Sequence, residues 1–229
     1  NANESVFIGD NTGYGAASAN NSVFIGSGVG GLATSSPYSV YVGDGAGQSA
    51  KNDGYSVFIG YLAGYITQGA NSIAIGTLAG SNELGEGGQQ DQSIAIGYYT
   101  GYNAQGTGGI AIGSEAQRLY SKTHSIAIGY QAGLSFQATS STATQNSIAI
   151  GIQAGYSSQQ VNSIAIGYQA GYTGQAIYSI SIGSNAGNIN QGKAAISIGE
   201  NAGSSNQNGK TISIGQFAGQ NSQGTGSIA

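Results

Sequence analysis

Apolar residues alternate with small or polar ones in a five-residue pattern that recurs along the whole chain. The pattern reads SIAIG in its commonest form, as at 163–167, and it starts fourteen times in 229 residues. Of the thirteen intervals between starts, eight are 16 residues, three are 17, and the other two are 21 and 22. A fixed period this short predicts a solenoid, in which each repeat forms one coil, and not a globular domain.

The alternation within each repeat predicts a short β-strand. Counting from the first residue of the pattern, positions 2 and 4 are Ile or Val, which is typical of a strand with one buried face. We therefore expect positions 2 and 4 to form the core, and stacked coils to place each Ile over the next. The predicted core ladder includes Val6, Ile8, Ile73, Ile75, Ile126, Ile128, Ile164, Ile166, Ile212 and Ile214.

Two glycines per repeat predict the corners of the coil. Position 5 is Gly in every complete repeat, and position 9 is Gly in all but one, where Gln117 stands. Glycines disfavour a helix, in which each costs about 1 kcal/mol relative to Ala, and after a strand they indicate a turn with positive φ. We expect two short strands and two corners per coil. The corner glycines include Gly9, Gly60, Gly97, Gly129, Gly167, Gly171 and Gly215.

These features predict an all-β fold, a parallel β-solenoid of about fourteen coils of 16–17 residues. Residues 1–229 form a single repeat segment, and two insertions, 81–92 and 134–146, lengthen two of the repeats. Insertions in solenoids are expelled as loops on one face, so we expect both to protrude. The chain begins without Met and stops three residues into another repeat, so we expect it to be a segment of a longer protein.

Position 3 lies on the strand face opposite to positions 2 and 4. It is aromatic in the first four repeats and Ala or Ser from Ala74 onward. Two interpretations are open: small residues are neutral on a solvent-facing strand, or this face packs closely against another copy of the chain. The candidate inter-chain face consists of Ala74, Ala95, Ala127, Ala165, Ser181 and Ser213.

The repeated unit resembles a known family. NSIAIG, at 71–76, 146–151 and 162–167, resembles the head repeats of trimeric autotransporter adhesins. The longer form NSIAIGYQAGY, at 162–172, is also similar to repeats of phage tail fibres and large bacterial surface proteins. The resemblance covers essentially the whole chain. It implies a left-handed parallel β-roll, assembled as a homotrimer in the head or shaft of an extracellular fibre.

Composition and charge exclude several classes of protein. Only 6% of residues are charged and the net charge is −4, with five bases that form no cluster, so a nucleic-acid partner is not expected. No apolar run approaches the ~18–20 residues that a membrane helix needs, so we expect no membrane contact by this segment. The chain has no Cys, which excludes disulfides and thiolate metal sites.

Candidate chemistry is sparse. His124 is the only histidine and the chain has no cysteine, so Ser-His or Cys-His catalysis would rest on this one residue, and we expect it to be a surface turn histidine. Among the acids only Glu83, Glu86 and Asp91 cluster, in a Gly/Gln-rich insertion that favours a solvated loop. Asp10 and Asp44 share position 6, but the other repeats do not continue a calcium ladder. We therefore predict no catalytic residue, no cofactor, no metal site and no enzymatic activity.

Tyrosine recurs at two positions that flank the second corner. Position 6 and position 10 each carry it in several repeats, and two interpretations are open. Stacked tyrosines can form exposed structural ladders, or they can form a lateral contact surface or a glycan-binding face. The position-6 tyrosines are Tyr61, Tyr98, Tyr130 and Tyr168, and the position-10 tyrosines are Tyr14, Tyr65, Tyr102, Tyr156 and Tyr172.

Together these observations predict a non-enzymatic structural and adhesive segment of an extracellular or cell-surface fibre. Its expected partner is itself, in a homotrimer, with a surface glycan or receptor as a further partner. Two alternatives stay open: the shaft of a viral tail fibre or receptor-binding fibre in a virion, and a self-assembling extracellular scaffold filament.

Overall fold

The computed structural model describes residues 3–51, 53–82, 88–119, 123–135 and 146–229. These residues form an all-β structure without a helix, a parallel β-solenoid of about 12 turns. The chain divides into two compact units, an N-terminal unit (Asn1–Ser121) and a C-terminal unit (Lys122–Ala229). Each unit repeats the same coil.

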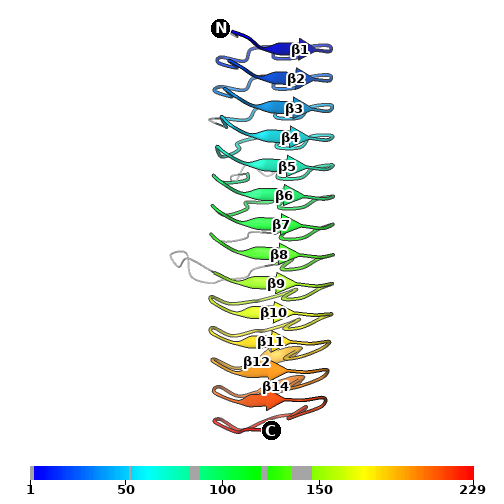
Figure 1. Ribbon diagram of the computed structural model, residues 1–229, viewed down its shortest axis with the longest axis vertical. Coiled ribbons are helices and arrows are strands. Elements are labelled where there is room, and N and C mark those ends of the chain that lie inside the picture. The colour runs from blue at the N-terminus through cyan, green and yellow to red at the C-terminus, as the bar shows by residue number, and fades with distance from the viewer. Residues whose placement is uncertain (1–2, 52, 83–87, 120–122, 136–145) are drawn as a thin grey trace. The chain divides into compact units, whose positions relative to one another are not determined.

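In the N-terminal unit, each described coil contributes one three-residue strand to a parallel ladder (Figure 1). Strands follow one another in sequence order, and each position pairs with the same position of the next coil, as Val6 does with Val23. The strands are β1 (Val6–Ile8), β2 (Val23–Ile25), β3 (Val40–Val42), β4 (Val57–Ile59), β5 (Ile73–Ile75), β6 (Ile94–Ile96) and β7 (Ile110–Ile112).

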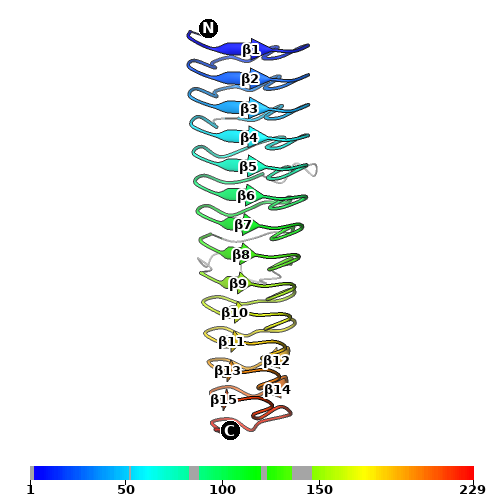
Figure 2. The same ribbon diagram turned by 45° about the vertical axis from the view of Figure 1, so that its right-hand side comes forward.

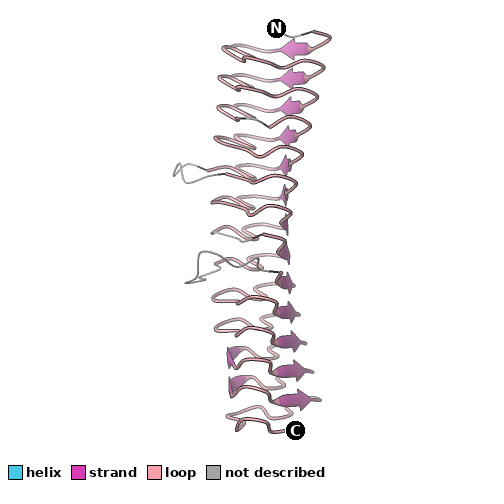
Figure 3. Ribbon diagram, turned by 90° about the vertical axis from the view of Figure 1, so that its left-hand side faces the viewer, coloured by secondary structure: helices cyan, strands magenta, loops and turns pink. Residues whose placement is uncertain are grey.

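The C-terminal unit forms a ladder of the same kind and adds a second, two-stranded sheet. Its main strands are β8 (Ile126–Ile128), β9 (Ile148–Ile150), β10 (Ile164–Ile166), β11 (Ile180–Ile182), β13 (Ile196–Ile198) and β15 (Ile212–Ile214). β12 (Ile189–Gln191) pairs with β14 (Ser205–Gln207) on the opposite side of the coil (Figures 2 and 3). The predicted second strand is therefore a full strand in two described coils, and elsewhere it is reduced to single bridges such as Ser157↔Thr173.

Backbone hydrogen bonds hold each coil to both of its neighbours. In the C-terminal unit, the Ile164 N–H donates to the Ser179 carbonyl of the next coil at 2.9 Å, and the Gly167 N–H donates to Ile150 of the previous coil at 2.8 Å. The N–H and C=O groups of the strands are thus satisfied by the neighbouring coils. The side chains alone therefore determine which strand face lies inside.

The predicted core ladder is wrong: the structure places positions 2 and 4 on the outside and position 3 inside. All ten predicted ladder residues are exposed or partly exposed: Val6, Ile8, Ile73, Ile75, Ile126, Ile128, Ile164, Ile166, Ile212 and Ile214. The predicted inter-chain face is wrong for the same reason. Its six residues are completely buried within the single chain: Ala74, Ala95, Ala127, Ala165, Ser181 and Ser213.

Small position-3 side chains and buried glutamines fill the interior of the coils that carry Ala or Ser at position 3. A Cβ placed on Gly171 would lie 3.3 Å from the Ala165 Cβ across the interior, so the backbone at position 9 lies close to the position-3 side chain in this coil. The remaining space is filled by Gln175, whose side chain is completely buried and whose Nε2 donates to the Ile164 carbonyl at 2.7 Å. In coils of this kind the interior is therefore filled by small side chains and a hydrogen-bonded amide, and the isoleucines of positions 2 and 4 lie on the outer face.

The N-terminal coils fill the same interior with aromatic rings. Phe24 and Tyr41 stack with ring centroids 4.5 Å apart, and Tyr41 and Phe58 stack at 4.8 Å. All three side chains are completely buried. Phe7 extends the stack at 5.1 Å from Phe24 but is 39% exposed.

The corner glycines adopt the positive φ that a turn after a strand requires. A Cβ on Gly167 would lie 2.6 Å from the Gly183 carbonyl oxygen of the next coil, so stacking itself excludes a side chain at position 5. Position 9 differs: Gly171 has φ +55°. The position-5 glycines Gly9, Gly60, Gly97, Gly129, Gly167 and Gly215 have φ from +124° to +138°.

The first predicted insertion is shorter than expected. Residues 81–82 and 88–92 belong to the coil: the Asn82 N–H donates to the Tyr65 carbonyl at 3.1 Å, and Gln89 is buried with its Nε2 2.9 Å from the Ile73 carbonyl. The protruding loop predicted for 81–92 is therefore wrong for these residues, and 83–87 lie outside the described residues. Of the second insertion, 134–146, Leu134 is buried, whereas 136–145 lie outside the described residues.

Candidate interaction surfaces

The outward positions 2 and 4 give each unit a face of partly exposed Ile and Val. In the N-terminal unit Ile25 and Val40 are each 37% exposed, and in the C-terminal unit Ile128 is also 37% exposed. Parallel pairing places these side chains at the coil spacing of about 4.8 Å. We call this surface the Ile/Val face. Contiguous apolar surface of this kind marks interaction sites more often than isolated exposed residues do.

The two sets of tyrosines occupy different environments. The four position-6 tyrosines are about half exposed. At position 10, Tyr14 is 72% exposed, Tyr102 is buried, and Tyr156 and Tyr172 stack at 4.8 Å. Position 6 therefore leaves aromatic rings partly exposed to solvent, whereas at position 10 Tyr102, Tyr156 and Tyr172 make contacts within the solenoid.

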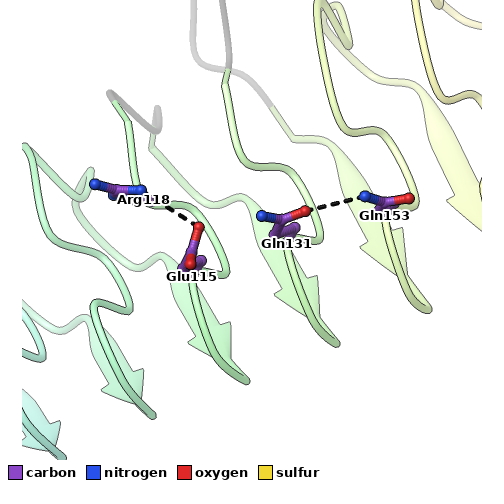
Figure 4. Close-up of polar contacts among 4 residues, drawn as sticks. All are labelled: Glu115, Arg118, Gln131 and Gln153. Carbon is purple, nitrogen blue, oxygen red and sulfur yellow. Dashed lines mark hydrogen bonds and ion pairs between the residues drawn. The ribbon is translucent and has the colours of Figure 1, made fainter.

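A ladder of glutamine amides runs beside the position-6 side chains in the C-terminal unit. The Gln153 Nε2 donates to the Gln131 Oε1 at 3.0 Å (Figure 4), and the Gln169 Nε2 donates to the Gln153 Oε1 at 2.9 Å. All three residues occupy position 7 and are partly exposed. The ladder orients a row of amide groups along the stack of coils.

An aromatic cluster with an ion pair lies on the N-terminal unit. Arg118 forms an ion pair with Glu115 at 3.3 Å (Figure 4), and its guanidinium lies 5.4 Å from the Tyr99 ring centroid. Tyr99 also contacts Tyr98, with centroids 4.5 Å apart. A partly exposed pair of this kind contributes about 0–1 kcal/mol, which makes the cluster a local support for the coil.

Asp53, an acid with a shifted pKa, lies in the interior. Asp53 is completely buried and accepts hydrogen bonds from the Ser36 hydroxyl, at 2.6 Å, and from the Tyr41 hydroxyl. Burial raises the pKa of the Asp53 carboxyl above its usual 3.8, although both hydrogen bonds oppose the rise. Burial and the neighbouring carboxyl also raise the pKa of Tyr41. With no access to solvent, the pair supports the interior and has no route to a substrate.

The other residues with candidate chemistry do not converge. His124 is exposed, with φ +55°, in the turn before β8, and Asp10 is exposed in the turn after β1. In the described parts of the chain, no three His, Asp or Glu side chains lie close enough together to hold a metal ion. Of the acid cluster predicted for the first insertion, Asp91 accepts from the Ala70 N–H at 2.9 Å, while Glu83 and Glu86 lie outside the described residues. The described residues also contain no helix that could span a membrane.

Comparison with known proteins does not assign the chain to a family, so its class is described from its fold and its surfaces. No known protein family and no curated protein matches it. The class that the structure defines is a parallel β-solenoid repeat protein with an outward Ile/Val face and exposed tyrosines, whose interior holds aromatic rings in the N-terminal coils and small side chains with glutamine amides in the others.

Proposed function

We propose that this chain is a non-enzymatic structural and adhesive segment of an extracellular fibre, a left-handed β-roll that assembles as a homotrimer. The observation that carries the proposal is the Ile/Val face. A repeat protein that stood alone would gain by carrying polar residues on its outer strand face, yet positions 2 and 4 here are Ile or Val throughout.

Association through the Ile/Val face would remove the remaining exposed apolar surface from water. Burying the exposed part of one Ile side chain contributes on the order of 1 kcal/mol, and the contribution recurs at two positions in every coil. The face is also regular, because each Ile lies beside the Ile of the next coil, as Ile164 does beside Ile180. A second copy of the chain has Ile and Val side chains at the same coil-to-coil spacing. A homomeric partner therefore fits this face, and the resemblance to trimeric adhesin heads sets the expected number at three.

The mass of the full chain in solution tests the proposal. We expect light scattering to give three times the chain mass of 22.7 kDa. The double variant Ile150→Lys/Ile166→Lys places two charges on the Ile/Val face of adjacent coils, where a lone solenoid tolerates them because the lysine stems keep the charges in water. The variant should run at the mass of one chain and retain its β-type circular dichroism.

A matched control and a contradicting outcome complete the test. Tyr178 is 56% exposed and lies outside the Ile/Val face, so Tyr178→Lys should remain trimeric. A wild-type chain that runs as a monomer at all accessible concentrations would contradict the homotrimer. Ala165→Glu cannot serve here: it should unfold the coil in any oligomeric state, because Ala165 faces the interior.

A further inference from the structure

Three consecutive coils of the C-terminal unit present a strip of exposed side chains just after the corner glycine. Tyr130 is 46% exposed, and Ile152 and Tyr168 are each 50% exposed. Their backbones are bonded from coil to coil: the Gln153 N–H donates to the Tyr130 carbonyl at 2.8 Å, and the Gln169 N–H donates to Ile152 at 3.0 Å. The spacing of the strip is therefore set by the solenoid and does not depend on a flexible loop.

The two tyrosines of this strip are separated by one intervening coil. At about 4.8 Å per coil, their attachment points lie about 10 Å apart along the stack. Two aromatic platforms at that separation match a partner with a repeat of the same length. An extended β-(1→4)-linked polysaccharide has such a repeat, because every second sugar presents the same face.

The amide ladder gives the strip its polar component. Gln131, Gln153 and Gln169 lie next in sequence to the strip residues, and the ladder uses one of the two N–H groups of Gln153 and of Gln169. Positions 6 and 7 of these three coils carry no charged residue. A neutral partner that combines flat apolar faces with many hydroxyls fits such a surface, whereas a charged polymer gains nothing from it.

We propose that Tyr130, Gln131, Ile152, Gln153, Tyr168 and Gln169 form a binding surface for an extended, neutral, β-linked polysaccharide that lies along the solenoid axis. The tyrosine rings stack on the apolar faces of alternate sugars, and the amides bond hydroxyl groups between them. This inference rests on the proposed adhesive function and names the class of ligand that it would bind.

The N-terminal unit provides an internal comparison. Tyr61 and Tyr98 are also separated by one coil and are 51% and 52% exposed. The residues beside them at position 7 include Leu62 and Leu78, so the amide row is missing there. We therefore expect the polysaccharide to favour the C-terminal unit.

Titration of the full chain with cellohexaose tests the proposal, with maltohexaose as the α-linked comparison. The chain has no Trp, so tyrosine fluorescence reports binding directly. We expect saturable binding of cellohexaose and on the order of tenfold weaker binding of maltohexaose. Tyr130→Ala/Tyr168→Ala should weaken cellohexaose binding on the order of tenfold or more, whereas Tyr130→Phe/Tyr168→Phe should keep most of it, and isothermal calorimetry reads the variants independently of fluorescence. The N-terminal pair Tyr61→Ala/Tyr98→Ala should have a smaller effect.

The outcomes separate this inference from the proposed function. No binding of cellohexaose, or equal binding by the Tyr130→Ala/Tyr168→Ala variant, would overturn the ligand class, while a trimeric mass and adhesion of the fibre to a surface would leave the proposed function standing. A change of light-scattering mass in the same variant, without any sugar binding, would show that the strip contacts another copy of the chain and would also overturn the inference. The chain mass measured alone tests only the assembly.

Discussion

Glutamine at position 13 and glycine at position 9 depend on each other within one coil. The Gln175 Oε1 occupies the place that a side chain at Gly171 would need: a Cβ there would lie 2.6 Å from it. The Gln105 and Gly101 pair repeats the same distance. In the coil where position 9 is Gln117, position 13 is not Gln but Ser121, and Gln117 is itself completely buried. The interior amide of a coil is thus supplied either by position 13, as with Gln175, or by position 9, as with Gln117.

Gly171→Ala should destabilise the chain by about 2–4 kcal/mol, because it adds the cost of a left-handed backbone for Ala to a collision with the buried amide. Gly28 is the matched control: its φ is +62°, and a Cβ there would meet nothing within 4 Å, so Gly28→Ala should cost only about 1–2 kcal/mol. Denaturant unfolding measures both. Adding Gln175→Ala to Gly171→Ala should cost less than the sum of the two single changes, and strict additivity would contradict the coupling.

Asp53 predicts a pH dependence of the N-terminal unit. Burial raises the folded-state pKa above 3.8, so the folded state holds the proton more tightly than the unfolded chain. The associated stability is complete below 3.8 and is lost as pH rises through the folded-state pKa. The groups that face the carboxyl are the Tyr41 and Ser36 hydroxyls, which also hold it in place.

Thermal unfolding at about pH 4 and about pH 7 tests this prediction. Asp53→Asn keeps the shape of the side chain and removes its charge. We expect this variant to be more stable than the wild type at the higher pH, and we expect the difference in stability to be smaller at the lower pH. If the stability of Asp53→Asn differed from that of the wild type by the same amount at both pH values, the proton affinity of Asp53 would not change on folding.

At the scale of an element, the coils use two alternative interiors. From β1 to β4 a stack of rings fills the space, and from β5 onward, at the coils with Gln at position 13, Ala or Ser together with the amide fills it. Both fillings reach the wall at position 9: a Cβ on Gly47 would lie 2.6 Å from the Tyr41 ring. The backbone of the coil is therefore compatible with a ring or with an amide, but the volume must be filled by one of them.

Phe24→Ala should remove about 3–5 kcal/mol of stability, because it leaves a ring-sized cavity between two stacked neighbours. Phe7 is the matched control at the end of the stack. It is 39% exposed, so Phe7→Ala should cost clearly less. Denaturant unfolding compares the two variants, and equal losses would indicate that the interior of the stack is not closed to water.

At the scale of the whole molecule, the coil is the unit of construction. Within each unit, described coils bond to one another through the same backbone positions, as the Ile164 N–H does with the Ser179 carbonyl and the Ile180 N–H with the Ala195 carbonyl. A solenoid of this kind is stabilised by contacts between nearest neighbours. Its length can change by whole coils without changing any contact type.

Deletion of residues 163–178, one complete coil, should leave a folded chain with unchanged β-type circular dichroism and a modest loss of stability. After the deletion Ile148 and Ala149 meet Ile180 and Ser181 in the register they already use with their present neighbours. Deletion of 163–170 removes half a coil, disrupts the register and should prevent folding of the C-terminal unit. Similar behaviour of the two deletions would contradict a coil-by-coil construction.

The sequence by itself determined the solenoid, its parallel register and its corners. A period of 16 or 17 residues forces equivalent positions into neighbouring coils, and glycine at position 5, as at Gly167, can be read directly as a turn because few other residues adopt its φ. The buried glutamines could also have been predicted, because Gln recurs at position 13 from Gln68 to Gln223. They were missed because a search for apolar periodicity does not detect a polar residue.

Only the tertiary structure decided which strand face lies inside. Alternation places Ile164 and Ile166 together and Ala165 opposite, but it is the same whichever face is buried, and the expectation that larger apolar residues lie inside favours the wrong one. The deciding contribution is the set of side chains that fills the interior. In the coil of Ala165 the small side chain and the buried Gln175 amide fill it, and in the N-terminal coils a ring at position 3, such as Tyr41, fills it, so Ile and Val lie outside in both.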